Sequence, residues 1–202
     1  MNPYAQGGWN GPSSSHSHTG LPVLYGALPY PTAASCATAP TFICFTFTYT
    51  DSILNSTVTG PQNRVYFRVS TDTTSPSRSI ITAEPDGTSV ARVEWRTYPV
   101  FELRGLVQRN STAQWLPLSA SQTYRTMTVR GRTYRWTPRD SHIELAGAPP
   151  SAGGGPQLLG RVSQGQTPQT TVLSVTPEAI QIGLLEPAVL ATIFLLCGRN
   201  ID

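Results

Sequence analysis

A chain of 202 residues is long enough for one domain with its own core, and a second domain is not expected. Only 12% of the residues are charged, and the net charge of +3 is too small to demand nucleic acid as a partner, although it is compatible with an anionic membrane surface. The three cysteines are widely spaced and contain no CxxC pair, which disfavours a disulfide framework and a zinc site.

Residues 1–40 differ in composition from the rest of the chain. They are rich in Gly, Pro, Ser and Ala, and such a segment buries too little apolar surface to fold. We expect a disordered tail there, followed by a single domain over residues 41–202. The first ten residues have neither a basic start nor an apolar segment, so no secretory signal is predicted and the protein is expected to be intracellular.

The domain begins with a pattern typical of a β-strand. Phe45, Phe47 and Tyr49 alternate with threonine, and residues two apart lie on the same face of a strand. Eleven further segments of β-branched, aromatic or alternating residues follow, separated by turn-forming residues. These expected strands are Ile53–Val58, Arg64–Ser70, Ser79–Ala83, Ser89–Tyr98, Val100–Leu103, Tyr124–Val129, Arg132–Trp136, His142–Leu145, Leu158–Val162, Thr171–Val175 and Ala179–Ile182.

The register of one hairpin can be predicted. Arg130-Gly131 suits a two-residue turn, which pairs Val129 with Arg132. Side chains on one face of such a hairpin then meet in cross-strand pairs. Counting outward gives the pairs Met127–Tyr134 and Arg125–Trp136 on one face and Thr126–Arg135 on the other.

The last segment, residues 186–198, is apolar on every side. Pro187 suits the first turn of a helix and Gly198 its end. A helix without a polar face must be surrounded, and the preceding strands can do this. A C-terminal membrane anchor is the competing interpretation, but the apolar run is about half of the ~20 residues that span a bilayer. Thr192 is compatible with burial, because its hydroxyl can bond to a carbonyl one turn earlier.

Together these elements predict a mainly β fold with no helix before the last segment. Short strands with hairpin connections close best into a barrel. The expected fold class is a closed antiparallel β-barrel of about twelve strands, with the C-terminal hydrophobic helix, residues 186–198, at its centre.

Three segments, followed by the apolar helix, resemble a known family. They are Val90-Ala91-Arg92-Val93-Glu94-Trp95-Arg96, Arg132-Thr133-Tyr134-Arg135-Trp136 and His142-Ile143-Glu144-Leu145. In this order they resemble an uncharacterised domain family of mushroom-forming fungi, which looks like a distant member of the tubby C-terminal-like superfamily that includes the phospholipid scramblases. The resemblance covers residues 53–199 and implies a barrel around a central hydrophobic helix. Tubby domains bind phosphoinositide headgroups through basic surface residues, but no motif here transfers those positions.

A group of arginines in two hairpins, near Tyr134 and Trp136, is the strongest candidate site. Guanidinium groups bind phosphate through two parallel hydrogen bonds, and aromatic neighbours suit a membrane interface. The alternative is that these charges only keep a β-rich surface soluble. The candidate headgroup-binding residues are Arg125, Arg130, Arg132, Arg135 and Arg139.

Other polar patterns predict structure rather than chemistry. Arg92, Glu94 and Arg96 alternate on one strand and indicate a cross-strand charge ladder. Cys44 and Cys197 lie in apolar runs and are expected to be small buried hydrophobes. Residues 140–142 contain the side chains of a hydrolase triad, Asp, Ser and His, but consecutive residues cannot align as a relay. We therefore expect no enzyme, no cofactor and no metal site.

Two functions remain. The first is non-enzymatic binding of anionic lipid headgroups, phospholipid or phosphoinositide, at a membrane surface. The alternative is a protein-interaction scaffold whose tail, residues 1–40, recruits a protein partner. Nucleic acid is not an expected partner, because the sequence contains no recognised module and no strongly basic stripe.

Overall fold

The structure is a computed structural model, and it describes residues 41–72, 77–147 and 155–202. The tail of residues 1–40 lies outside the described residues, and with it the expected disorder and the expected contact with a protein partner.

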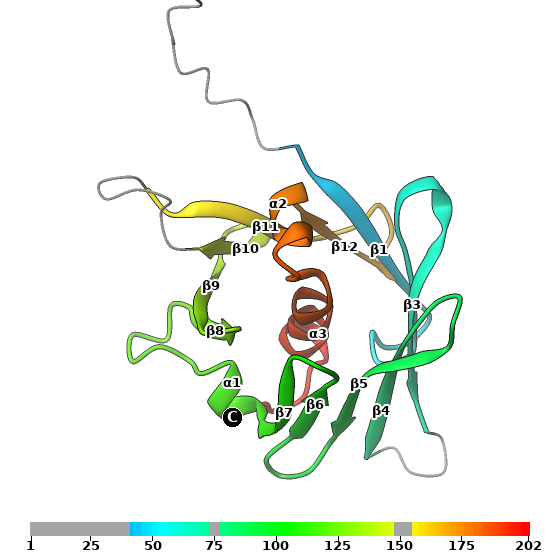
Figure 1. Cartoon of the computed structure of the whole chain (residues 1–202), viewed down its shortest axis with the longest axis horizontal. Helices are drawn as coiled ribbons and strands as arrows, with labels where there is room; N and C mark the ends of the chain where they lie inside the picture. Colours follow the sequence, from blue (N-terminus) through cyan, green and yellow to red (C-terminus); the bar gives the residue numbers. More distant parts are fainter. Residues whose placement is uncertain (1–40, 73–76, 148–154) are drawn as a thin grey trace, which may run out of the picture. The chain divides into compact units, whose positions relative to one another are not determined.

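The domain is mainly β, and its strands form one antiparallel sheet of 12 strands that curves into a nearly closed barrel (Figure 1). The strands are β1 (Ile43–Tyr49), β2 (Ser56–Thr59), β3 (Val65–Thr71), β4 (Arg78–Ala83), β5 (Thr88–Glu94), β6 (Val100–Leu103), β7 (Val107–Ser111), β8 (Arg125–Val129), β9 (Arg132–Pro138), β10 (His142–Gly147), β11 (Gln157–Gln164) and β12 (Thr170–Val175). The helices are η1 (Pro61–Asn63), α1 (Thr112–Trp115), α2 (Pro177–Gln181) and α3 (Leu185–Leu196).

The strand order is β7-β6-β5-β4-β3-β2-β1-β12-β11-β10-β9-β8. Strands that follow one another in the chain therefore pair throughout, except β7 and β8. In addition, β1 pairs with β12, and this pairing joins strands β1–β7 and strands β8–β12 into one sheet. β7 and β8 are the two ends of the sheet, and the short helix α1 lies in the chain between them.

α1 joins the two ends of the sheet through side-chain and backbone hydrogen bonds. Ser111 caps the helix by accepting from the backbone N–H of Gln114. The indole Nε1 of Trp115 donates to the carbonyl of Thr128 in β8 at 3.1 Å. On the other side, the backbone N–H of Thr112 donates to the carbonyl of Pro99, just before β6, at 2.9 Å. The gap in the ladder is thus bridged rather than open.

The apolar C-terminal segment is a helix, as predicted, although α3 begins one residue earlier and ends two residues earlier than expected. Its residues Pro187 to Phe194 are all buried. The ring of Phe194 contacts three aromatic rings, those of Trp95, Phe101 and Trp115. The hydroxyl of Thr192 donates to the carbonyl of Ala188 at 2.7 Å, which confirms the predicted bond within the helix. In the described part of the chain, no helix has the length and apolarity to cross a membrane.

The predicted register of the Arg130-Gly131 hairpin is confirmed. Both turn residues have positive φ, 50° and 75°, the conformation that a tight two-residue turn needs. Val129 pairs with Arg132, and every pair counted outward from the turn agrees with the prediction. One face of the hairpin is buried, with Met127, Tyr134 and Trp136, and the other face carries Arg135 outward.

Four expectations were wrong. The sequence predicted no helix before the last segment, but the short helices η1, α1 and α2 precede α3. The segment Ala179–Ile182 is not a strand, because Thr176 caps a helix and Pro177 occupies its first turn, so that α2 forms there. β7 was not predicted, since its five residues contain one apolar side chain, Val107. The thiol of Cys44 is exposed on β1 rather than buried, and lies 3.5 Å from the hydroxyl of Ser174.

Two buried tryptophans differ in their hydrogen bonding and allow a matched test of the core. Trp115 and Trp136 are 4% and 1% exposed, but among the described residues the Nε1 of Trp136 has no partner. A buried N–H without a partner costs stability, whereas Trp115→Phe removes a donor that a carbonyl uses. We expect Trp115→Phe to lower the free energy of unfolding by about 1–3 kcal/mol more than Trp136→Phe. Urea denaturation of both variants measures this, and equal losses would contradict it.

Candidate functional site

The outer face of β9 carries a row of polar side chains. Tyr134 and Trp136 point into the core, so the alternating residues Thr133, Arg135 and Thr137 point outward. β8 places Thr126 directly opposite Arg135, as the hairpin register predicts. Polar side chains from two strands are therefore gathered on one outer surface.

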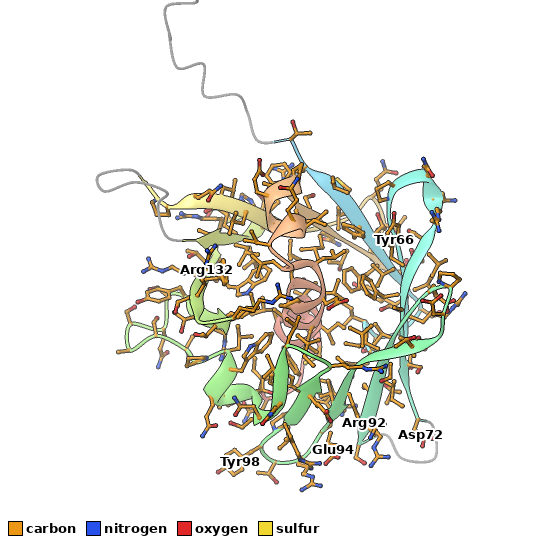
Figure 2. The ribbon with its side chains drawn as sticks, in the orientation of Figure 1. Tyr66, Asp72, Arg92, Glu94, Tyr98 and Arg132 are labelled. Atoms are coloured by element: carbon orange, nitrogen blue, oxygen red, sulfur yellow. The ribbon has the colours of Figure 1, made fainter. Side chains whose placement is uncertain are left out.

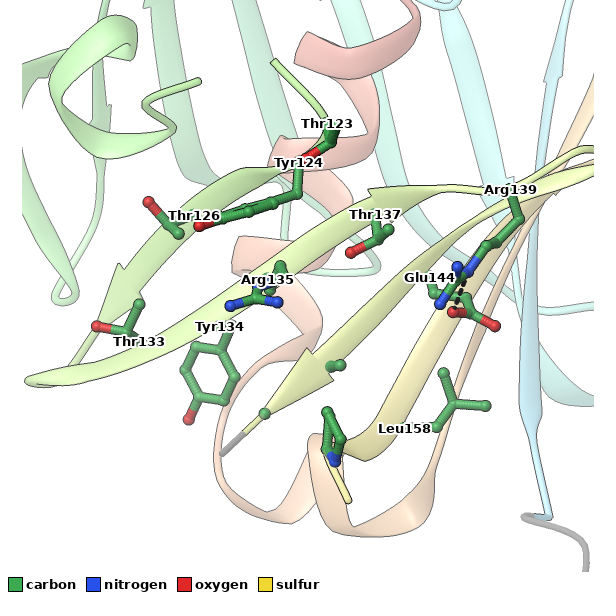
Figure 3. Close-up of a pocket in the computed structure, with 13 residues that line it drawn as sticks. Thr123, Tyr124, Thr126, Thr133, Tyr134, Arg135, Thr137, Arg139, Glu144 and Leu158 are labelled. Atoms are coloured by element: carbon green, nitrogen blue, oxygen red, sulfur yellow. Dashed lines mark hydrogen bonds and ion pairs between the residues drawn. The ribbon is translucent and has the colours of Figure 1, made fainter. Parts of the chain in front are cut away.

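A hollow of about 800 Å³ lies over this surface (Figure 3). Its size falls within the range of small-molecule sites, about 300–1,000 Å³. We call it the Arg135 hollow. Its lining residues are Thr123, Tyr124, Thr126, Thr133, Tyr134, Arg135, Thr137, Arg139, Glu144, Ala146, Gly147, Pro156 and Leu158.

The guanidinium of Arg135 is the basic group in the middle of the hollow. Its Cζ lies 4.1 Å from the centroid of the Tyr124 ring, so the two groups stack (Figure 3). Among the described residues no carboxylate pairs with it. Stacking orients the planar group and leaves its N–H donors available, and the hydroxyls of Thr126, Thr133 and Thr137 lie around it.

Arg139, at one side of the hollow, is neutralised within the domain. Its Nε donates to Glu144 at 2.8 Å (Figure 3), and Nε2 of His142 lies 3.3 Å from the other carboxylate oxygen. The hydrogen bond from Arg139 lowers the pKa of the Glu144 carboxyl, against the opposing effect of burial, and His142 adds to the lowering. Arg139 therefore contributes less free positive charge than Arg135.

The structure does not bring all five predicted arginines together. Arg135 and Arg139 line the Arg135 hollow, whereas Arg130 and Arg132 line a second, smaller hollow at the tip of the hairpin. Arg125 lies apart from both, and its side chain is only 15% exposed. It donates to both carboxylate oxygens of Asp202, at 2.7 and 2.6 Å, and to the carbonyl of Leu116. This bond lowers the pKa of Asp202 despite partial burial.

The charge ladder predicted on β5 is confirmed at Glu94. Its carboxylate lies 2.7 Å from both Arg96 and Arg109 and 4.0 Å from Arg78. Burial acts to raise the pKa of Glu94, but the hydrogen bond from Arg109 and the three positive charges outweigh it, so the pKa is lowered. These arginines are used in structure, in contrast with Arg135.

The arrangement around Arg135 suits recognition of an anion. A guanidinium and three hydroxyls supply hydrogen-bond donors on one surface, and Tyr124 and Leu158 supply apolar area beside them. Within the described residues no group of three His, Cys, Asp or Glu side chains is placed to hold a metal ion. Ser141 Oγ lies 3.2 Å from Nδ1 of His142, a contact between neighbouring residues at the start of β10.

Sequence reasoning named Arg135 and Arg139, with Tyr134 near them, but missed the other lining residues of the hollow. Tyr124 was the least predictable, since it precedes β8 and reaches Arg135 across the hairpin. The threonines carried a usable signal. The predicted register already placed Thr126 opposite Arg135, and Thr133 and Thr137 are two residues on either side of it on the same face.

Fold and site together define a β-barrel protein with a candidate anion-binding hollow. The model of a family of unknown function, DUF6593, matches residues 51–193, and the chain belongs to this family. None of the curated proteins matches the chain. Among solved structures, the X-ray structure of a protein from Arabidopsis thaliana aligns over 76% of this chain and 93% of that chain, with 13% sequence identity and a TM-score of 0.41.

The lowered pKa of Glu144 predicts a pH dependence of stability. A carboxyl whose pKa is lower in the folded than in the unfolded protein stabilises the fold above the unfolded pKa, and this contribution is lost as the pH falls through the folded pKa. We expect Glu144→Gln to cost about 0.5 kcal/mol at neutral pH, a small value because Arg139 is exposed to solvent, and to cost nothing in strong acid. Urea denaturation across this pH range measures the difference.

The matched control is the same substitution made in an Arg139→Gln background. Without Arg139, the cost of Glu144→Gln at neutral pH should become smaller, because the first cause of the lowered pKa is gone. A cost that stays the same at every pH, or that does not depend on Arg139, would contradict this account.

Proposed function

We propose that this protein is a non-enzymatic module that binds anionic phospholipid or phosphoinositide headgroups at a membrane surface, and that the Arg135 hollow receives the phosphate. The observation that carries the proposal is the state of Arg135. Its guanidinium is exposed, it stacks on Tyr124, and no carboxylate neutralises it among the described residues. An exposed, oriented guanidinium surrounded by hydroxyls matches the hydrogen-bonding needs of a phosphate group.

The surroundings of the hollow also favour a headgroup over a buried small molecule. The site lies on an outer strand face and is open to solvent-borne or membrane-borne ligands. Tyr124 has an apolar ring and a polar hydroxyl, the combination that suits a membrane–water interface. On this proposal the protein is intracellular and attaches to the membrane from outside the bilayer, by charge and by contact at the interface.

We further propose that the barrel is of the tubby C-terminal-like kind, with α3 as its central helix. Support comes from the burial of Pro187 to Phe194 and from the aromatic contacts of Phe194. In Figure 1, α3 lies within the ring of strands. Hydrogen exchange tests this placement, because the amides of a helix enclosed by the barrel should exchange only on global unfolding. Fast exchange of the Leu190 and Ile193 amides would refute it.

Co-sedimentation with vesicles tests the binding function. We expect the full chain to bind phosphatidylcholine vesicles that contain phosphatidylserine or a phosphoinositide, and to bind neutral phosphatidylcholine vesicles weakly. Binding should fall as salt is added, because screening weakens attraction between exposed charges. Arg135→Gln should weaken binding by about tenfold or more, the cost of losing a charged hydrogen bond.

Arg68→Gln is the matched control for this experiment. It removes the same single charge, but Arg68 lies on β3, far from β9 in the strand order, and is paired with Glu84 at 2.9 Å. We expect it to bind vesicles like the unchanged protein. Equal losses from both substitutions would reduce the effect to net charge, and no binding at low salt would refute the function.

A further inference from the structure

The second hollow, at the tip of the β8–β9 hairpin, has its own chemistry. Its volume is about 290 Å³, and its lining residues are Val129, Arg130, Arg132, Tyr134 and Ile182. The floor is apolar, since Val129 and Tyr134 are buried. Two guanidiniums stand beside this floor, and Arg132, labelled in Figure 2, begins β9 on the same strand face as Tyr134. We call this the tip hollow.

The backbone of Arg130 has an unfavourable conformation, and its side chain is fixed by packing. Its φ of 50° is left-handed, where Asn or Gly would fit with less strain. Its guanidinium packs directly on Gly183, at the end of α2. A Cβ added to Gly183 would lie 3.2 Å from Nη1 and 3.3 Å from Cζ of Arg130. The two-residue turn requires this φ, and the packing on Gly183 fixes where the guanidinium lies.

The position of the Arg130 guanidinium beside α2 is not explained by a need to cap that helix. The carbonyls of Ile180 and Ala179, in the last turn of α2, already accept from the backbone N–H groups of Gly183 and Leu184, both with separations close to 3 Å. This is the usual way in which a glycine of positive φ closes a helix, and Gly183 has φ 78°. The guanidinium donors of Arg130 are therefore not required by the helix end.

Arg132 adds a second guanidinium at the same hollow. Within the described part of the chain, neither Arg130 nor Arg132 has a carboxylate partner. Two like charges at the edge of one apolar hollow repel each other, and an anion between them would relieve the repulsion and accept hydrogen bonds from both. The apolar floor at the same time offers burial to a hydrocarbon or aromatic group.

We propose that the tip hollow binds a small amphiphilic anion, with a carboxylate between Arg130 and Arg132 and an apolar body against Val129, Tyr134 and Ile182. At roughly 30 Å³ per heavy atom, the share of one water molecule in the liquid, the hollow has room for about ten heavy atoms. A medium-chain fatty acid or an aromatic carboxylate has this size. The tip hollow shares Tyr134 with the Arg135 hollow, but its guanidiniums are different ones, and the proposal does not depend on the headgroup-binding function.

Octanoate is a suitable probe, because it combines a carboxylate with an apolar chain of this length. Titration into the full chain, followed by ¹H–¹⁵N NMR, should shift the amide signals of Ile182 and Gly183 in a saturable way. Octanamide, which has the same chain without the charge, and acetate, which has the charge without the chain, should each bind more weakly by about tenfold or more.

Three variants locate the site. Arg132→Gln should weaken octanoate binding by about tenfold or more. Arg130→Asn should weaken it similarly while keeping the turn, because Asn tolerates positive φ. Arg135→Gln, which alters the other hollow, should leave the affinity for octanoate unchanged. The proposal is overturned if octanoate causes no shifts at Ile182 and Gly183, if octanamide binds as well as octanoate, or if Arg135→Gln weakens binding as much as Arg132→Gln does.

Discussion

The need to cover α3 determines the rest of the structure. A helix with apolar side chains on all sides has no stable position at a protein surface in water, and here Pro187 to Phe194 are buried in succession. The cover comes from aromatic residues of distant segments, Trp95 after β5, Phe101 in β6 and Trp115 in α1, whose rings contact Phe194. The side chains at these inward-facing positions must therefore be large and apolar. The alternate, outward positions of the strands are then free to carry charge and to bind ligands.

The distribution of acidic residues decides which outward charges are available. Residues 103–139 contain seven arginines and no aspartate or glutamate, so any ion pair must recruit an acid from elsewhere in the chain. In the described part of the chain, three such ion pairs form: Arg109 with Glu94, Arg125 with Asp202, and Arg139 with Glu144. The arginines of this segment that remain without a carboxylate partner among the described residues are Arg104, Arg130, Arg132 and Arg135. Three of these four lie on one hairpin, which is why both hollows with candidate anion chemistry are found there.

Local rules predicted much of the fold and little of the site. The β8–β9 register followed from one turn, because Arg130-Gly131 fixes the pairing and alternation then assigns every side chain to a face. α2 was missed because Ala179–Ile182, four residues of mixed propensity, were assigned to a strand. Thr176 followed by Pro177 is the stronger signal, and it marks the start of a helix. The surroundings of the predicted arginines depended on contacts that no spacing reveals. The stacking of Tyr124 on Arg135, the pairing of Arg125 with Asp202, and the packing of Arg130 on Gly183 join segments whose separation is set only by tertiary structure.

The order of the strands in the sheet departs from their order in the chain at two places. β7 and β8 follow one another in the chain but do not pair. β1 and β12 do pair, with Ile43 beside Val175, although they are the first and last strands of the chain. Each half of the barrel is a meander of sequence neighbours that can form locally. Joining β1 to β12 instead requires the closure of almost the whole domain as a single loop, whose entropy cost grows with its length. We expect this one pairing to dominate the folding barrier, so that substitutions in β1 and β12 slow folding while substitutions in other strands mainly speed unfolding.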